Sequence, residues 1–165
     1  MTRVRGRVGG TLIGLLALGV FPSGQATSGE ISVKAVAEVR VATKEGGIEA
    51  VHLSPAGRVV PGDELMYTLE IRNAGASALH SPTVTYPVPA HMALVADSVT
   101  GPGADVTYSV DGGLSFGAPE ELQMRGEDGN SRQAFSSEYT HIRWKFKNTL
   151  KSNSVAFTRF RVVVK

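Results

Sequence analysis

The chain has 165 residues and no cysteine, which excludes a disulfide framework, a thiolate metal site and a lipid-modified cysteine. Its formal net charge is +2, but residues 1–26 hold three arginines and no acid. Without them the 17 Lys and Arg fall to 14 against 15 acids, which excludes the strongly basic surface expected of a nucleic-acid-binding domain.

Residues 1–26 have the three parts of an export signal. Three arginines lie within the first seven residues, an apolar run covers 12–21, and the small residues Gly24 and Ala26 follow. A membrane-spanning helix needs about 20 consecutive apolar residues, and this run is shorter. The sequence predicts cleavage after Ala26 and an exported mature protein without stable membrane insertion, whether periplasmic, cell-surface or extracellular.

Alternation of apolar and polar side chains predicts strands along the rest of the chain. The clearest alternation begins at Leu65, where every second residue is apolar as far as Ile71. We expect 27–44 to form an N-terminal strand or linker and 45–165 to form the domain. The predicted strands are, in chain order, 31–41, 48–53, 65–71, 79–86, 92–96, 106–110, 139–147 and 157–165.

Residues typical of turns separate these strands. Pro61 and Gly62 suit the centre of a type II turn, and the run Asp111-Gly112-Gly113 suits a tight hairpin. The run Asn73-Ala74-Gly75 ends a strand with residues that tolerate left-handed angles, and Pro87 and Pro89 mark a bend or a sheet edge.

About seven to nine short strands predict two packed antiparallel sheets, an all-β immunoglobulin-like sandwich. Its core is expected to centre on Tyr67, Trp144 and Phe160. The polar stretch 117–138 is predicted to be the longest connection and a mobile loop.

The last two predicted strands are expected to pair as a hairpin. Their polar residues would then share one face with no acid among them, which suggests an anionic partner such as an acidic envelope polysaccharide or a lipid head group. The alternative is that these cations only protect a sheet edge from aggregation. The residues of this predicted basic face are Arg143, Lys145, Lys147, Arg159 and Arg161.

Two stretches, VVPGDELMYTLEIRNAG at 59–75 and the segment ending YPVPAHMALVADS at 86–98, resemble the conserved-repeat domain of bacterial surface and envelope proteins. The matching residues are Pro61, Gly62, Asp63, Tyr67, Asn73, Gly75 and Pro89. Tyr86 departs from the family, which has Asp or Asn there. The resemblance spans 45–165 and implies an immunoglobulin-like spacer, stalk or adhesive unit without catalytic residues, here in a single-copy secreted form.

The run Gly113-Leu114-Ser115-Phe116-Gly117 matches the nucleophile pattern of hydrolases, which requires a following helix. No helix is predicted there. The segment 109–116 instead resembles the Asp-box hairpin of β-propellers, in which the carboxylate of Asp111 would accept backbone N–H groups and close a turn that includes Gly113.

No metal or cofactor site is predicted. The four histidines, at 52, 80, 91 and 141, lie in different predicted elements. The acidic run 127–130 concentrates oxygen ligands, so calcium binding and a solvated loop both remain open.

Three functional hypotheses follow. The first is a non-enzymatic structural or interaction module of the envelope or the secreted fraction, with an envelope protein or an anionic polysaccharide as partner. The second is a recognition module for an anionic glycan or lipid. The third is a module that binds its partner by exchanging a strand, with 31–41 as the candidate edge.

Overall fold

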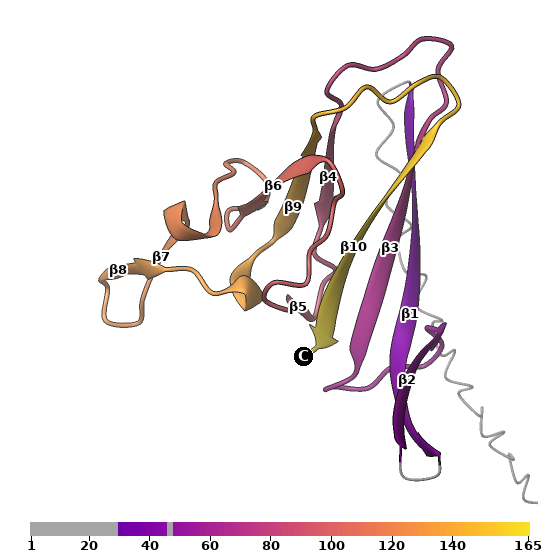
Figure 1. Cartoon of the computed structure of the whole chain (residues 1–165). Helices are drawn as coiled ribbons and strands as arrows, with labels where there is room; N and C mark the ends of the chain where they lie inside the picture. Colours follow the sequence, from indigo (N-terminus) through magenta and orange to yellow (C-terminus); the bar gives the residue numbers. More distant parts are fainter. Residues whose placement is uncertain (1–29, 46–47) are drawn as a thin grey trace, which may run out of the picture.

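This computed structural model describes residues 30–45 and 48–165. These residues contain ten strands and two short 3-10 helices, joined by loops (Figure 1). No α-helix occurs in these residues, so the predicted all-β class is confirmed. The predicted export segment lies outside them. The strands are β1 (Ile31–Glu45), β2 (Ile48–Pro55), β3 (Glu64–Asn73), β4 (Thr83–Pro87), β5 (Met92–Leu94), β6 (Ala104–Ser109), β7 (Gln123–Arg125), β8 (Ser131–Gln133), β9 (His141–Phe146) and β10 (Val155–Val164); the helices are η1 (Pro119–Glu121) and η2 (Ser136–Glu138).

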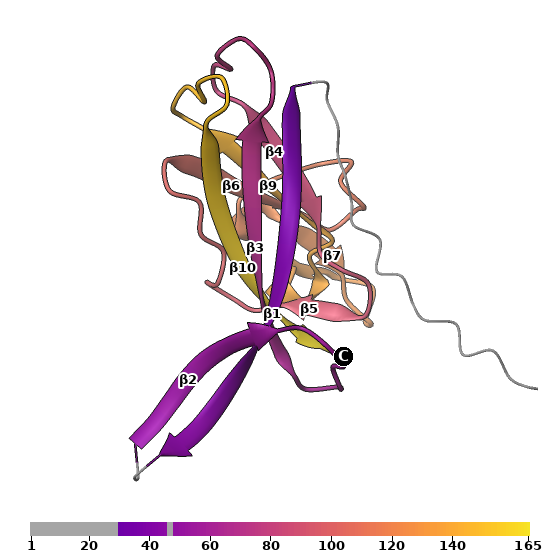
Figure 2. The same cartoon turned by 90° about the vertical axis from the view of Figure 1, so that its right-hand side faces the viewer.

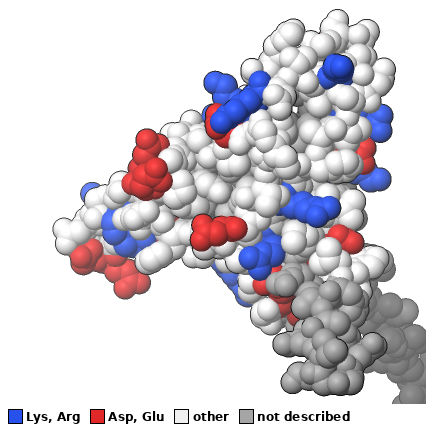
Figure 3. All heavy atoms as spheres, viewed as in Figure 1, with Lys and Arg blue, Asp and Glu red and all other residues white. Residues whose placement is uncertain are grey.

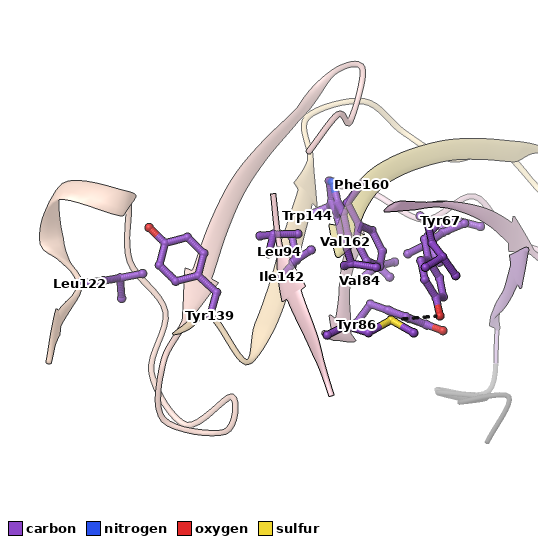
Figure 4. Close-up of a cluster of buried hydrophobic side chains, with 14 of the residues drawn as sticks. Tyr67, Val84, Tyr86, Leu94, Leu122, Tyr139, Ile142, Trp144, Phe160 and Val162 are labelled. Carbon is purple, nitrogen blue, oxygen red and sulfur yellow. Dashed lines mark hydrogen bonds between the residues drawn. The ribbon is translucent and has the colours of Figure 1, made fainter. Parts of the chain in front are cut away.

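The strands form three antiparallel sheets. A five-stranded sheet has the order β2-β1-β3-β10-β5, a three-stranded sheet has the order β4-β9-β6, and β7 pairs with β8 in a small ribbon. The two larger sheets face each other across one apolar core (Figures 1 and 4). No helix in the described residues has the length and hydropathy needed to cross a membrane.

Three aromatic residues occupy the centre of this core, as expected from the sequence. Trp144 from the three-stranded sheet and Phe160 from the five-stranded sheet are fully buried, with ring centroids 6.3 Å apart. Tyr67 stacks on Phe160 with centroids 5.1 Å apart. Burial of each such side chain is worth about 1.5–3 kcal/mol, so this cluster is a main source of stability.

The predicted pairing of the last two strands is wrong. β9 pairs with β4 and β6, whereas β10 lies between β3 and β5 in the opposite sheet. The predicted inward faces are nevertheless correct, because Ile142 and Trp144 in β9 and Phe160 and Val162 in β10 are all fully buried. Alternation identified the faces of the strands but not their partners.

β1 serves two partners in succession. Its residues 31–39 pair with β3, and its residues 38–45 pair with β2. The far half of β1 therefore leaves the two facing sheets and, together with β2, projects from them as a two-stranded ribbon (Figure 2). The first half of β1 is part of the five-stranded sheet.

The stretch 117–138 is more structured than the loop we predicted. It contains both 3-10 helices and the β7–β8 ribbon, which brings the strands of the described residues to ten. Leu122 and Ala134 join the core, and their backbones are linked by a hydrogen bond of 2.9 Å from the Ala134 N–H to the Leu122 carbonyl. Strands of three residues give too short an alternation to be detected in the sequence.

Two turns show how local chemistry positions β3. The Asp63 N–H donates to the Val60 carbonyl at 3.0 Å, and Gly62 has φ +96°, which is the geometry of a type II turn. At the other end Asn73 is fully buried, and its side-chain oxygen accepts the Gly75 N–H at 2.9 Å. Residues 73–75 tolerate left-handed angles, but none of the three has a positive φ, and this side-chain bond closes the turn.

Candidate interaction surfaces

The five residues of the predicted basic face lie on two opposite surfaces. Arg143, Lys145 and Lys147 follow the outer face of β9, while Arg159 and Arg161 follow the outer face of β10. The premise of a single basic face is therefore wrong, because the strands that carry it belong to different sheets. On the side seen in Figure 3, Lys and Arg are interspersed with Asp and Glu.

Three of these five cations already have partners. Lys147 forms an ion pair of 2.7 Å with Asp105, and Arg161 forms one of 3.0 Å with Glu64. The guanidinium of Arg143 lies 3.4 Å from the centroid of the Phe116 ring. Lys145 and Arg159 make no ion pair with the described residues, and they lie on opposite faces.

The Asp111 carboxylate closes the turn that follows β6. It accepts the Ser109 hydroxyl at 2.7 Å, the backbone N–H groups of Leu114 and Ser115 at 3.0 Å, and the Ser115 hydroxyl at 2.5 Å. These hydrogen bonds, led by that from Ser109, hold the pKa of Asp111 well below its ordinary value. The carboxylate is therefore committed to the backbone.

The hydrolase-like pattern 113–117 lies on the same turn. Gly113 has φ +88°, a left-handed angle that suits glycine, and the Ser115 hydroxyl is directed at Asp111. The His141 ring nitrogen lies 3.3 Å from the Thr140 hydroxyl. In the described residues no histidine is hydrogen-bonded to Ser115, so the geometry contains no serine–histidine pair.

Histidines and acids do not gather into a metal-binding cluster within the described ranges. The side chain of His52 is not among those that the structure describes. In the acidic run 127–130, Asp128 accepts the Asn130 N–H at 3.0 Å and its side-chain amide at 2.9 Å, and these bonds lower the pKa of Asp128. The turn thus uses its own carboxylate internally.

The hydrogen-bond direction along β1 follows from two bonds. The Ala74 N–H donates to the Glu30 carbonyl, and the Ala56 N–H donates to the Ala37 carbonyl. The direction of backbone hydrogen bonding alternates along an antiparallel strand. The N–H and C=O groups of even-numbered residues of β1 therefore point toward β3, and those of odd-numbered residues point toward the side on which β2 lies. β2 begins to pair only near Ala37.

The first half of β1 is therefore an open sheet edge. The backbone N–H and C=O groups of Val33 and Ala35 point away from β3, and no strand of the described residues pairs with them. Nearby Lys34 and Val36 are exposed on the outer face. This edge contains no proline and a single lysine, so little in its sequence blocks the addition of another strand.

A groove of about 370 Å³ lies at the opposite edge of the two sheets. We call it the tyrosine groove; its lining includes Leu94, Asp97, Tyr108, Gln133, Phe135 and Tyr139. Sequence reasoning missed it, because it joins the turn after β5, the edge strand β6 and the predicted loop 117–138. The only signal in the sequence was the concentration of aromatic residues near that loop.

No family model, curated protein or solved structure matches the chain.

Proposed function

We propose that this chain is a non-enzymatic interaction module, exported to the envelope or the medium, that binds a partner by adding a strand to the open edge of β1. The observation that carries the proposal is that no strand of the described residues pairs with the outward backbone groups of Val33 and Ala35. An extended partner segment gains main-chain hydrogen bonds there without any rearrangement of the fold.

The other edges of the two facing sheets offer less. β5 has three residues, β4 follows Pro82 and ends in Pro87, and β6 is partly covered because Tyr108 and Gly117 exchange both backbone hydrogen bonds. Short strands, prolines and covering segments are the usual protections of sheet edges. The first half of β1 lacks all three, which supports it as the binding edge.

The proposal includes an immunoglobulin-like fold related to the conserved-repeat domain. Four strands of one sheet, β1-β3-β10-β5, facing the three of β4-β9-β6 give the layer sizes of an immunoglobulin constant-type domain. The turns at Pro61–Asp63 and Asn73–Gly75 support the resemblance. One difference is that the last two strands of an immunoglobulin domain share a sheet, whereas β9 and β10 do not.

The test compares two substitutions at one position. Ala35→Pro removes the outward N–H while leaving the bonds of β3 intact, and Ala35→Ser keeps the N–H as a matched control. Partners captured from envelope extract by the tagged protein should be lost with Ala35→Pro and retained with Ala35→Ser. Equal thermal stability of the two variants would show that the fold is intact.

Hydrogen exchange identifies the mode of binding. On addition of the captured partner, the amides of Val33 and Ala35 should gain protection, since they acquire acceptors. Unchanged exchange at these two amides, or equal capture by both variants, would disprove strand addition at β1.

A second function, binding of an anionic glycan or lipid, is favoured only by the row Arg143, Lys145 and Lys147 on the outer face of β9. Retention on immobilised polygalacturonate should fall with salt and with Lys145→Gln, but not with Lys151→Gln elsewhere on the surface. If retention changes neither with the salt concentration nor with Lys145→Gln, this function is eliminated.

A further inference from the structure

The tyrosine groove combines aromatic rings with an apolar floor. Tyr108 and Tyr139 stack with centroids 4.7 Å apart, and the Phe135 ring is 64 % exposed. Leu94 and Val99 contribute aliphatic surface. A volume of about 370 Å³ is at the small end of ligand sites and suits one long side chain.

The Tyr139 hydroxyl and the Asp97 carboxylate, both at the groove, have no hydrogen-bond or ion-pair partner among the described residues. Tyr139 is 7 % exposed, and its hydroxyl makes no hydrogen bond with the described residues. Among the described residues, only the Thr158 hydroxyl, away from the groove, is both unpaired and sealed from solvent, so the Tyr139 hydroxyl is not completely sealed. Figure 4 shows it pointing away from the cluster around Trp144 and Phe160.

The second group is the Asp97 carboxylate, which makes no ion pair with the described residues. Its backbone has φ +53°, a left-handed angle that aspartate tolerates better than most residues. The next residue fixes this turn, because the Ser98 hydroxyl donates to the Val95 carbonyl at 2.7 Å and accepts the Arg161 N–H at 3.0 Å. The position of Asp97 is therefore determined by β10.

The charges that act on the two tyrosine hydroxyls are negative. Burial raises the pKa of Tyr108, and Tyr139 and Asp97 raise it further; burial raises the pKa of Tyr139, and Glu120 adds to it. Of the neighbouring cations, Arg132 is ion-paired with Glu138 and its guanidinium lies over the Phe135 ring, 4.8 Å from the centroid. The Lys165 ammonium donates to the Ser137 carbonyl. The side of the groove that holds Asp97 and Tyr108, away from Arg132, therefore favours a cation.

We infer that the tyrosine groove binds the guanidinium group of an arginine side chain presented by a partner polypeptide. A guanidinium is planar, so it stacks on aromatic rings while its N–H groups donate to the carboxylate of Asp97. The Tyr139 hydroxyl offers a further acceptor. The groove lies at the β5 and β6 edges, so this inference does not depend on strand addition at β1.

The probe is N-acetyl-arginine amide, and its uncharged counterpart of equal shape is N-acetyl-citrulline amide. In NMR titrations of the ¹⁵N-labelled protein, we expect the arginine probe to shift amides at 95–99 and 134–139, with a Kd of roughly 1–10 mM. The citrulline probe should bind at least about tenfold more weakly, the effect of one charged hydrogen bond.

Two variants connect the binding to the groove. Asp97→Asn keeps a residue that accepts the left-handed angle but removes the charge, and should weaken arginine binding about tenfold. Glu70→Gln, on the outer face of β3, is the matched control and should leave it unchanged. Equal binding of both probes, unchanged binding by Asp97→Asn, shifts outside the groove or no binding at 20 mM would each overturn the inference.

Discussion

The indole of Trp144 lies directly against the backbone of Gly101. A Cβ atom at residue 101 would meet the indole ring, with Nε1 at 2.9 Å and Cδ1 closer still. The same Nε1–H donates to the Thr100 carbonyl at 3.2 Å, which satisfies the buried donor. The central aromatic residue thus depends on a glycine that lies 43 positions earlier in the chain.

We predict that Gly101→Ala destabilises the protein by about 1–3 kcal/mol, because the added methyl group displaces a fully buried side chain. Denaturant unfolding measures the change. Gly57→Ala is the control, since a Cβ there would meet no atom within 4 Å, and it should be nearly neutral. Equal effects of the two substitutions would contradict the role assigned to Gly101.

Thr158→Val should stabilise the protein by about 1 kcal/mol. Thr158 is 1 % exposed and its hydroxyl has no hydrogen-bond partner, whereas valine has nearly the same shape without the polar atom. The reverse substitution in the same strand, Val162→Thr, should destabilise it. A loss of stability in Thr158→Val would mean that the hydroxyl has a partner in solution.

Asn73→Ala should cost about 2–3 kcal/mol in the free energy of unfolding. The buried Asn73 amide donates to the carbonyls of Ser77 at 2.7 Å and Leu150 at 3.0 Å, and alanine leaves both acceptors without this donor. Asn148→Ala, at an exposed position, is the control. An equally small effect in both variants would refute the prediction.

The carboxylates of Asp111 and Glu138 predict a loss of stability in acid. Hydrogen bonds from Arg132 and then from the Phe135 N–H lower the pKa of Glu138 to about 2, and the pKa of Asp111 is also lowered. In the unfolded chain both values lie near 4. Their stabilising contribution is therefore complete above about pH 4 and declines as the pH falls toward 2.

Thermal melts at pH 7, 4 and 2.5 check this prediction. Asp111→Asn and Glu138→Gln should each lower Tm at pH 7 and flatten its fall between pH 4 and 2.5. A variant whose Tm falls as steeply as that of the unchanged protein would show that its carboxylate is not coupled to folding.

The alternation of apolar and polar residues correctly predicted which side chains of β3 and β9 are buried, because this depends on one strand at a time. Leu65, Tyr67, Leu69 and Ile71 are buried in β3, as their spacing indicated, and Trp144 is fully buried. The partners of β9 and β10 were not predictable in this way, because a strand with one buried face fits either sheet. The connection 147–154, which a hairpin would have folded into a turn within one sheet, instead crosses from one sheet to the other.

The candidate sites were harder to predict for the same reason. The predicted basic face required β9 and β10 to be neighbours in one sheet. Its five residues lie on two opposite surfaces because the two strands belong to different sheets. The tyrosine groove depends on Asp97, Tyr108 and Tyr139, which come from three segments with no common sequence pattern. The β1 edge was easier to predict, because it lies within the single segment 31–41.

The division of β1 between two partners has a mechanical consequence. A pull on the β1–β2 ribbon along the strand direction is transmitted to the nine residue pairs that join β1 to β3, from Ile31↔Asn73 to Val39↔Leu65. Such a load acts on these pairs together, in shear, rather than opening them one after another. The ribbon is thus anchored to β1 and β3, the most extensively paired strands of the described residues.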